Sequence, residues 1–382
     1  MKITSGIILF LILLYPFFYA SSYVAFTINY SFVLYYYVPL TFVFLFLNLG
    51  NKPLAILKKN SVNLCLLLAI IALVAINTDD LRYSKPLLFF IYVLNLYLLS
   101  LTINFKEHFR LVRNFFLVFL VLSVLFLFKR DRYLDEDRYF AFLLSPTVYS
   151  VYAEVFLIIY LYQIKNIKWK TLMFLIAGFF IFITKTRLNL VFYISIPFLI
   201  YYFGNFNFSR WKVLLVYVFC LNMLYPIYSY LVTFNFGKAS LVSTRYEDGR
   251  DSSFGLRNYL NSITYDEYLH QTTVSEKLLG KGTERARKMI IDKLKADLFT
   301  HNDFIRFTYD FGLICTLLLL LFLYRVAKGH YISFILLLLY LFSFYHNMIY
   351  DFFLISVFIF YAGIKKEEPQ SDLNYTKEHS YG

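Results

Sequence analysis

Residues 171–203 read TLMFLIAGFFIFITKTRLNLVFYISIPFLIYYF, and this stretch decides the fold class. As a single helix it would be about 50 Å long, well beyond the roughly 30 Å hydrocarbon core of a bilayer. The polar residues at 184–187 divide it into two apolar halves, each close to the length of one spanning helix. The stretch therefore predicts two transmembrane helices joined by a minimal external turn.

The same apolar character extends along the whole chain. Of its 382 residues, 60% are apolar and 16% are charged, whereas a soluble globular protein has about 45–50% apolar and about 25% charged residues. This composition excludes the soluble globular and the disordered classes. Apolar runs of spanning length occur at about 5–25, 30–49, 62–77, 86–104, 114–128, 140–163, 171–184, 188–203, 213–232, 304–324, 331–347 and 350–364. We therefore predict an all-α integral membrane protein with about 12 transmembrane helices.

The distribution of basic residues predicts the orientation of these helices. With the N-terminus inside and the sides alternating, the cytoplasmic segments hold 17 Lys and Arg against 5 Asp and Glu. The positive-inside rule then places both termini in the cytoplasm. Most of the net charge of +13 reflects this topology, so we expect membrane lipids around the chain and no nucleic-acid partner.

One long polar segment, residues 233–303, interrupts the apolar pattern on the outer side, between the ninth and tenth spans. It carries 11 Lys and Arg and 10 Asp and Glu. Within it, residues 283–299 place their apolar side chains on one face, which predicts an amphipathic helix lying on the membrane or on the bundle. The chain thus divides into spans one to nine (1–232), a large external loop (233–303), spans ten to twelve (304–364) and a disordered cytoplasmic tail (365–382).

Several charged residues are not explained by topology. Lys185 and Arg187 lie in the external turn, where basic residues are disfavoured and burial of charge is costly. An anionic partner would explain them, and the alternative is a side chain that snorkels to phospholipid headgroups. In the external loop, Arg257 lies in FGLRNYL and Lys281 lies between Gly280 and Gly282. The alternatives there are a solvated arginine and an ordinary turn.

A second polar group lies where the external loop returns to the membrane. His301, Asn302 and Asp303 are followed by Arg306 and, further on, by Gly312. A histidine with its ordinary pKa of about 6.5 can act as a base near neutral pH, and a neighbouring Asn can orient a hydroxyl or the imidazole. The alternative is an interfacial anchor or a helix cap. In the sixth span, Glu154 is an acid without an obvious partner and is a functional candidate to which the sequence assigns no role.

The order of these motifs resembles the bacterial O-antigen polymerase and O-antigen ligase superfamily of multi-spanning glycosyltransferases, whose fold is GT-C-like. The resemblance rests on TKTR (184–187), LLGKG (278–282), HNDFIR (301–306) and Gly312, and on the long external loop between spans nine and ten. Similarity at the level of motifs covers about 184–190 and 253–316. Gly312 is followed by Cys315 where many members have a second glycine, and ligases often have Ser-Arg-Gly where this chain has TRL. The sequence HNDFIR is more similar to that of the polymerases.

The resemblance implies transfer of a glycan from an undecaprenyl diphosphate carrier to an acceptor hydroxyl at the outer face of the bacterial inner membrane. Arg187 and Arg257 would bind the donor diphosphate, because the guanidinium fork matches phosphate oxygens and stays charged. His301 would act as the general base. These three are the predicted catalytic residues. The predicted substrate-binding residues are Lys185, Lys281, Asn302 and Arg306.

The predicted activity is polymerisation of lipid-linked repeat units of an O-antigen, capsule or exopolysaccharide. We expect no metal and no cofactor, because arginines replace a divalent cation and Cys65, Cys220 and Cys315 lie in apolar runs. One alternative is a ligase that transfers finished glycan to lipid A core or to a protein. Another is a flippase or transporter of lipid-linked oligosaccharide, which would not need the external loop. Expected partners are the undecaprenyl-diphosphate-linked oligosaccharide, a chain-length regulator and the flippase of the same pathway.

Overall fold

The computed structural model describes residues 2–24, 30–49, 58, 60–80, 83–101, 109–128, 132–133, 136–137, 139–143, 145–206, 209–235, 252–295, 298, 300 and 302–362. Within these ranges, side chains are not described at 2–5, 18–24, 30–35, 48–49, 109, 128, 132–133, 136–137, 187, 223–235 and 252–258. The predicted cytoplasmic tail, 365–382, lies outside the described residues.

Each of the twelve apolar runs contains a helix. These are α1 (Lys2–Val24), α2 (Tyr30–Leu49), α4 (Ser61–Ile76), α5 (Lys85–Ser100), α6 (Phe109–Leu125), α7 (Pro146–Gln163), α8 (Ile167–Ile183), α9 (Arg187–Asn205), α10 (Arg210–Asn235), α15 (Asp303–Ala327), α16 (Tyr331–Ser343) and α17 (Phe352–Ala362). The segment predicted to be an external loop contains α12 (Ser252–His270), α13 (Val274–Leu279) and α14 (Arg285–Leu294). The short 3₁₀ turns are η3 (Phe126–Phe128) and η4 (Phe344–His346).

The prediction of an all-α fold is confirmed for the part of the chain that the structure describes. The strands found there are β1 (Arg132–Tyr133) and β2 (Glu136–Asp137), which form one antiparallel ladder of two residues each. The helix boundaries follow local chemistry. For example, Ser145 is extended and accepts a hydrogen bond from the backbone N–H of Val148 at 3.2 Å, and Pro146 then occupies the first turn of α7.

Two helical stretches are long and apolar enough to cross a membrane, Leu188–Asn205 within α9 and Asp303–Ala327, which is α15. The described residues also include six shorter apolar stretches, namely Gly6–Phe17, Tyr36–Leu47, Ser61–Ile76, Lys85–Ser100, Tyr331–His346 and Phe352–Ala362. Helix α17 has 11 residues and reaches only about 17 Å. The arrangement of about 12 spans therefore stays a prediction.

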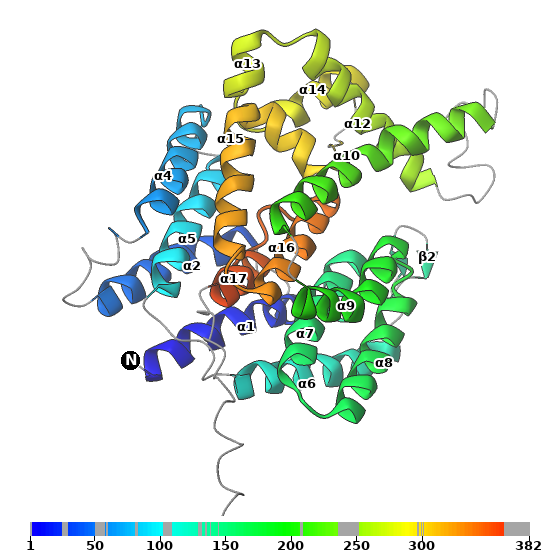
Figure 1. The fold of residues 1–382 in the computed structure, drawn as a ribbon. Coiled ribbons are helices and arrows are strands. Elements are labelled where there is room, and N and C mark those ends of the chain that lie inside the picture. The colour runs from blue at the N-terminus through cyan, green and yellow to red at the C-terminus, as the bar shows by residue number, and fades with distance from the viewer. Residues whose placement is uncertain are drawn as a thin grey trace, which may run out of the picture.

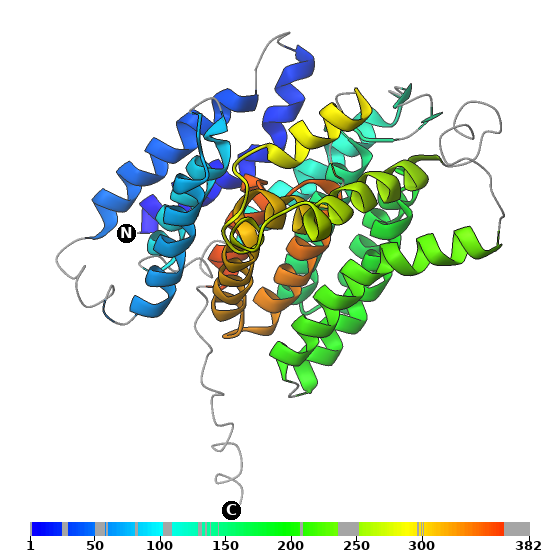
Figure 2. The same cartoon turned by 90° about the horizontal axis from the view of Figure 1, so that it is seen from above.

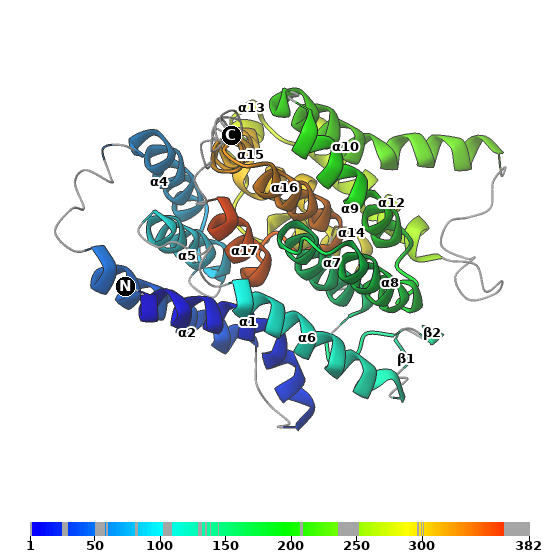
Figure 3. The ribbon, with the colours of Figure 1, turned by 60° about the horizontal axis from the view of Figure 1, so that its bottom comes forward.

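The helices of the bundle surround α15, α16 and α17. Helices α4 and α5 lie on one side of this central group and α7, α8 and α9 on the other, as Figure 3 shows from below. Helices α12, α13 and α14 gather at one end of the molecule, beside the first half of α15 (Figure 1). Seen from above, α12 and α14 cross over the bundle (Figure 2). The described helices of segment 233–303 therefore form a cap on one end of the bundle.

Helix α14 occupies the centre of the segment in which an amphipathic helix was predicted. It ends at Leu294 because Lys295 adopts a left-handed conformation with φ of 53°. Ala286 and Ile290 on its apolar face are fully buried, and the helix packs on α12 and α15. The contacts of α14 with other helices favour the second of the two predicted placements, on the bundle.

The cap is joined to the bundle where two glycine motifs pack backbone against backbone. Helix α15 is broken at Gly312, which has φ of 84° and ψ of 162°. Since the helix cannot continue there, nearby carbonyls accept hydrogen bonds from the cap: Lys281 N–H bonds to Tyr309 at 3.1 Å and Gly282 N–H bonds to Asp310 at 2.9 Å. A Cβ at Gly312 would lie 2.3 Å from the Leu278 carbonyl oxygen.

Gly312→Ala should therefore destabilise the protein by at least about 2 kcal/mol, through strain at positive φ and the clash with the cap backbone. Gly329→Ala is the matched control, because nothing lies within 4 Å of a Cβ built there. The midpoint of thermal unfolding in detergent measures both. Equal midpoints for the two variants would contradict the close backbone packing.

Candidate functional site

The three predicted catalytic residues are only partly described. Arg187 is the first residue of α9 and Arg257 lies in α12, but their side chains lie outside the described part of the structure. His301 lies outside the described residues altogether. Lys185, predicted to bind substrate, is exposed in the turn between α8 and α9 and has φ of 55°. The described part of the site consists of the segments that carry these residues.

The turn before Arg187 is fixed on α7 by three hydroxyl groups. The Oγ of Ser150 lies 2.9 Å from Oγ1 of Thr184 and 2.8 Å from Oγ1 of Thr186, and the two threonine oxygens are 2.7 Å apart. Ser150 and Thr184 are fully buried, and Thr186 is 9% exposed. Because each hydroxyl can donate and accept, the cluster satisfies itself and holds the start of α9 against α7.

The start of α15, next to His301, is held by buried charges. The Oδ1 of Asn302 accepts from the N–H of Phe304 at 2.9 Å, which makes it the N-cap of α15. Asp303 is fully buried, forms an ion pair with Arg306 at 2.6 Å and accepts from Ile349 N–H at 2.8 Å. The predicted substrate-binding residues Asn302 and Arg306 thus both make internal contacts.

Polar contacts link these segments to one another. The hydroxyl of Tyr152, on α7, donates to Asp351 at 2.7 Å, two residues beyond the Ile349 that bonds to Asp303. On the other side, Thr264 of α12 and Thr300 are joined by their hydroxyls at 3.0 Å. The turn before Arg187 is thus bonded to α7, α7 is bonded to Asp351, and Thr300, next to His301, is bonded to α12, the helix that carries Arg257.

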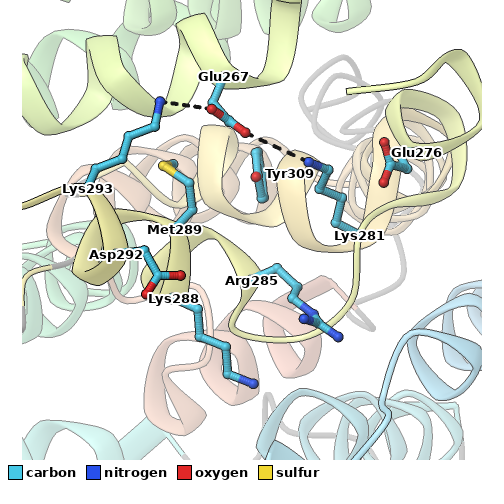
Figure 4. Close-up of a pocket in the computed structure, with 9 residues that line it drawn as sticks. All are labelled: Glu267, Glu276, Lys281, Arg285, Lys288, Met289, Asp292, Lys293 and Tyr309. Carbon is cyan, nitrogen blue, oxygen red and sulfur yellow. Dashed lines mark ion pairs between the residues drawn. The ribbon is translucent and has the colours of Figure 1, made fainter. Parts of the chain in front are cut away.

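Lys281 is the predicted site residue that faces a cavity. The cavity has a volume of about 530 Å³ and lies between the cap and α15. It is lined by Glu267, Glu276, Lys281, Arg285, Lys288, Met289, Asp292, Lys293 and Tyr309 (Figure 4). Glu267 lies between two lysines, 2.8 Å from Lys293 and 3.9 Å from Lys281. The ammonium of Lys281 also lies over the ring of Tyr309, 5.4 Å from its centre.

Short helices fix the walls of this cavity. Asp310 accepts from the N–H of Ala286 at 2.9 Å and so caps α14. Helix α13 begins with a capping box in which Thr273 and Glu276 bond each other's backbone N–H. Hydrogen bonds from the backbone N–H and the hydroxyl of Thr273 lower the pKa of Glu276, since they stabilise its charged form. The lining is therefore held in place before any ligand binds.

Sequence reasoning found Lys281 but missed Glu267, Lys293 and Tyr309. Each is an ordinary residue of a helix in the sequence, and only the packing of α12, α14 and α15 brings them together. In the described residues, no group of three His, Cys, Asp or Glu side chains is placed to hold a metal ion.

Comparison with known proteins assigns no family to the chain. No family model matches it, and neither a curated protein nor a solved structure matches it.

Removal of the buried carboxylate by Asp303→Ala should cost about 3 kcal/mol, because Arg306, whose side chain is only 17% exposed, then loses its partner. Asp266→Ala is the matched control: Asp266 pairs with His270 at 3.0 Å, but both side chains are about two-thirds exposed. Thermal unfolding in detergent compares the two. A loss for Asp303→Ala no larger than the loss for Asp266→Ala would contradict a buried role for the ion pair.

Proposed function

We propose that the chain is a glycosyltransferase that polymerises undecaprenyl-diphosphate-linked repeat units of a surface polysaccharide at the outer face of the bacterial inner membrane. The observation that carries the proposal is that buried polar contacts fix each of the motif-bearing segments. The turn before Arg187 is bonded to α7, Thr300 before His301 is bonded to the helix that carries Arg257, and Asp303 after His301 is bonded to Ile349.

The outward-facing side chains of the bundle support placement in a membrane. Phe46 is 79% exposed, Val191 67% and Phe182 66%, and further large apolar side chains of α6, α9 and α10 face outward as well. So many exposed large apolar side chains are a liability in water and are suited to lipid. Two helical stretches also meet the length and hydropathy of a membrane span.

In the proposed reaction, the acceptor hydroxyl attacks the anomeric carbon of the donor glycan. His301 takes the proton of that hydroxyl as the new carbon–oxygen bond forms. The bond from the anomeric carbon to the diphosphate breaks, and undecaprenyl diphosphate leaves with the electron pair. Arg187 and Arg257 stabilise the negative charge on the leaving diphosphate, because guanidinium groups bind phosphate oxygens in pairs.

Reconstitution of the purified protein in vesicles with the lipid-diphosphate-linked repeat unit tests this function. A ladder of products on a gel is the expected result, and EDTA should leave the ladder unchanged, since the arginines are proposed to do the work of a metal. A single addition to a distinct acceptor would instead indicate a ligase. Movement of the carrier lipid without a new glycosidic bond would overturn the proposal.

Single variants of the same preparation test the residues. Arg187→Ala, Arg257→Ala and His301→Ala should each slow polymer formation by at least about 10²-fold, the effect typical of a lost catalytic group. The matched controls are Arg287→Ala and His270→Ala in the cap, whose native side chains are 42% and 65% exposed. Wild-type chain lengths in all three site variants would contradict the assignment.

A further inference from the structure

The charges around the cavity of the cap are nearly balanced. Four of the lining residues are basic and three are acidic. Glu267 is shared between Lys281 and Lys293, while Arg285 pairs with Asp79 outside the cavity at 3.2 Å. A polyanion would require an excess of unpaired cations, and an apolar ligand would have to bury the lining charges at great cost. Both classes are therefore disfavoured.

A ligand with many hydroxyl groups suits this lining. Each hydroxyl donates one hydrogen bond and accepts others, so it can bond to a carboxylate and an ammonium at the same time. The side chains of Met289 and Tyr309 add apolar surface next to these charges. The volume of about 530 Å³ lies within the range of about 300–1,000 Å³ that is usual for small-molecule sites.

We propose that this cavity binds a neutral saccharide unit of the lipid-linked glycan, away from the bond that reacts. The assignment of this ligand rests on the proposed function. Lys281 is held for this task by its backbone, which is fixed between Gly280 and Gly282 and bonded to Tyr309. A cavity whose walls are fixed in advance loses little conformational entropy when the sugar binds.

Binding of the free repeat-unit oligosaccharide, released from its lipid by mild acid, tests the proposal. Calorimetry with the full chain in nanodiscs should show binding that Glu267→Gln weakens by about tenfold, the effect of one lost charged hydrogen-bond partner. Asp266→Asn, the neighbouring residue on an exposed face of α12, should bind as the wild type does. If Glu267→Gln fails to fold, Lys293→Ala, whose side chain is 42% exposed, carries the same test.

The outcomes separate this site from the proposed function. Wild-type affinity in Glu267→Gln or Lys293→Ala, or displacement of the oligosaccharide by inorganic diphosphate, would overturn the saccharide site. A product ladder from a protein that does not bind the free oligosaccharide would also overturn it, while leaving the polymerase intact. Binding without any ladder would contradict the polymerase and leave the saccharide site standing.

Glu154 is a buried acid outside the cavity of the cap. Glu154 lies on α7, one turn after Ser150, and is fully buried. Its Oε2 accepts a hydrogen bond from Nδ2 of Asn189, in the first turn of α9, at 3.4 Å. Its Oε1 and the Oδ1 of Asn189 are both buried without a hydrogen-bond partner among the described residues. If Glu154 were ionised, both of these oxygens could only accept.

We infer that Glu154 carries a proton on Oε1 and donates it to Oδ1 of Asn189. A neutral acid and an amide then form two hydrogen bonds, and no buried oxygen is left unpaired. An ionised carboxylate would be an unpaired buried charge among the described side chains, since none of their cations pairs with it. The hydroxyl of Tyr217 on α10, a titratable neighbour, donates to the Leu338 carbonyl at 3.1 Å instead.

The acid–amide pair makes Glu154 a positioning residue for the turn at 184–187. Ser150 and Glu154 lie on one face of α7, and both bond to the start of α9 or the turn before it. Together they fix the first turn of α9, where Arg187 begins the helix. This role needs the shape and the hydrogen bonds of Glu154 but not a negative charge.

Glu154→Gln separates a neutral from an ionised Glu154. Glutamine keeps the shape and both hydrogen bonds, so the unfolding midpoint and the rate of polymer formation should stay within about twofold of wild type, whereas Glu154→Ala loses both. Infrared spectra should show the C=O stretch of a protonated carboxyl in the wild type and its loss in Glu154→Gln. A defect in Glu154→Gln as large as in Glu154→Ala, or the absence of that band, would overturn the inference, whatever reaction the protein catalyses.

Discussion

The backbone contact between Gly280 and Gly312 is the constraint on which the capped end depends. The backbone at and just before each glycine leaves no room for a Cβ at the other: a Cβ at Gly280 would lie 2.4 Å from the Asp310 carbonyl oxygen. This contact breaks α15 and exposes the carbonyls that bind the cap. Asn77 at the end of α4 adds a third element, because its side chain donates to the Leu279 carbonyl at 2.8 Å. The cap, the broken helix α15 and the end of α4 are therefore connected at this point.

Several polar groups in the bundle form hydrogen bonds between helices. Tyr92 and Ser356 are joined at 2.7 Å, Tyr149 donates to Ser123 at 2.7 Å, and Ser333 donates to the Tyr361 carbonyl at 2.7 Å. Among apolar side chains such bonds specify which helices pair, because an unpaired polar group would be costly in the same surroundings. The polar oxygens of Glu154 and Asn189 are all hydrogen-bonded only if the acid is neutral.

The sequence predicted the helices well because apolar periodicity and length act locally. The division at 184–187 is present as the turn between α8 and α9, and the break after Ile183 needs no tertiary information. The cavity could not be predicted, since Glu267, Lys293 and Tyr309 come from three helices whose packing depends on the contact between the backbones at Gly280 and Gly312. The motif glycines were recognised, but their mutual contact depends on positive φ at both positions, which sequence spacing alone does not reveal.

Two of the basic residues predicted to bind substrate are paired with carboxylates of the chain itself. Arg306 is paired with the buried Asp303, and Lys281 shares Glu267 with Lys293. A ligand anion would have to replace these carboxylates, and leaving a carboxylate buried without its cation costs more than a new surface contact returns. Arg306 is therefore better suited to hold the start of α15, next to His301, than to bind a diphosphate. By the same reasoning, binding of the diphosphate in the proposed reaction depends on the two arginines of the TKTR turn and of α12.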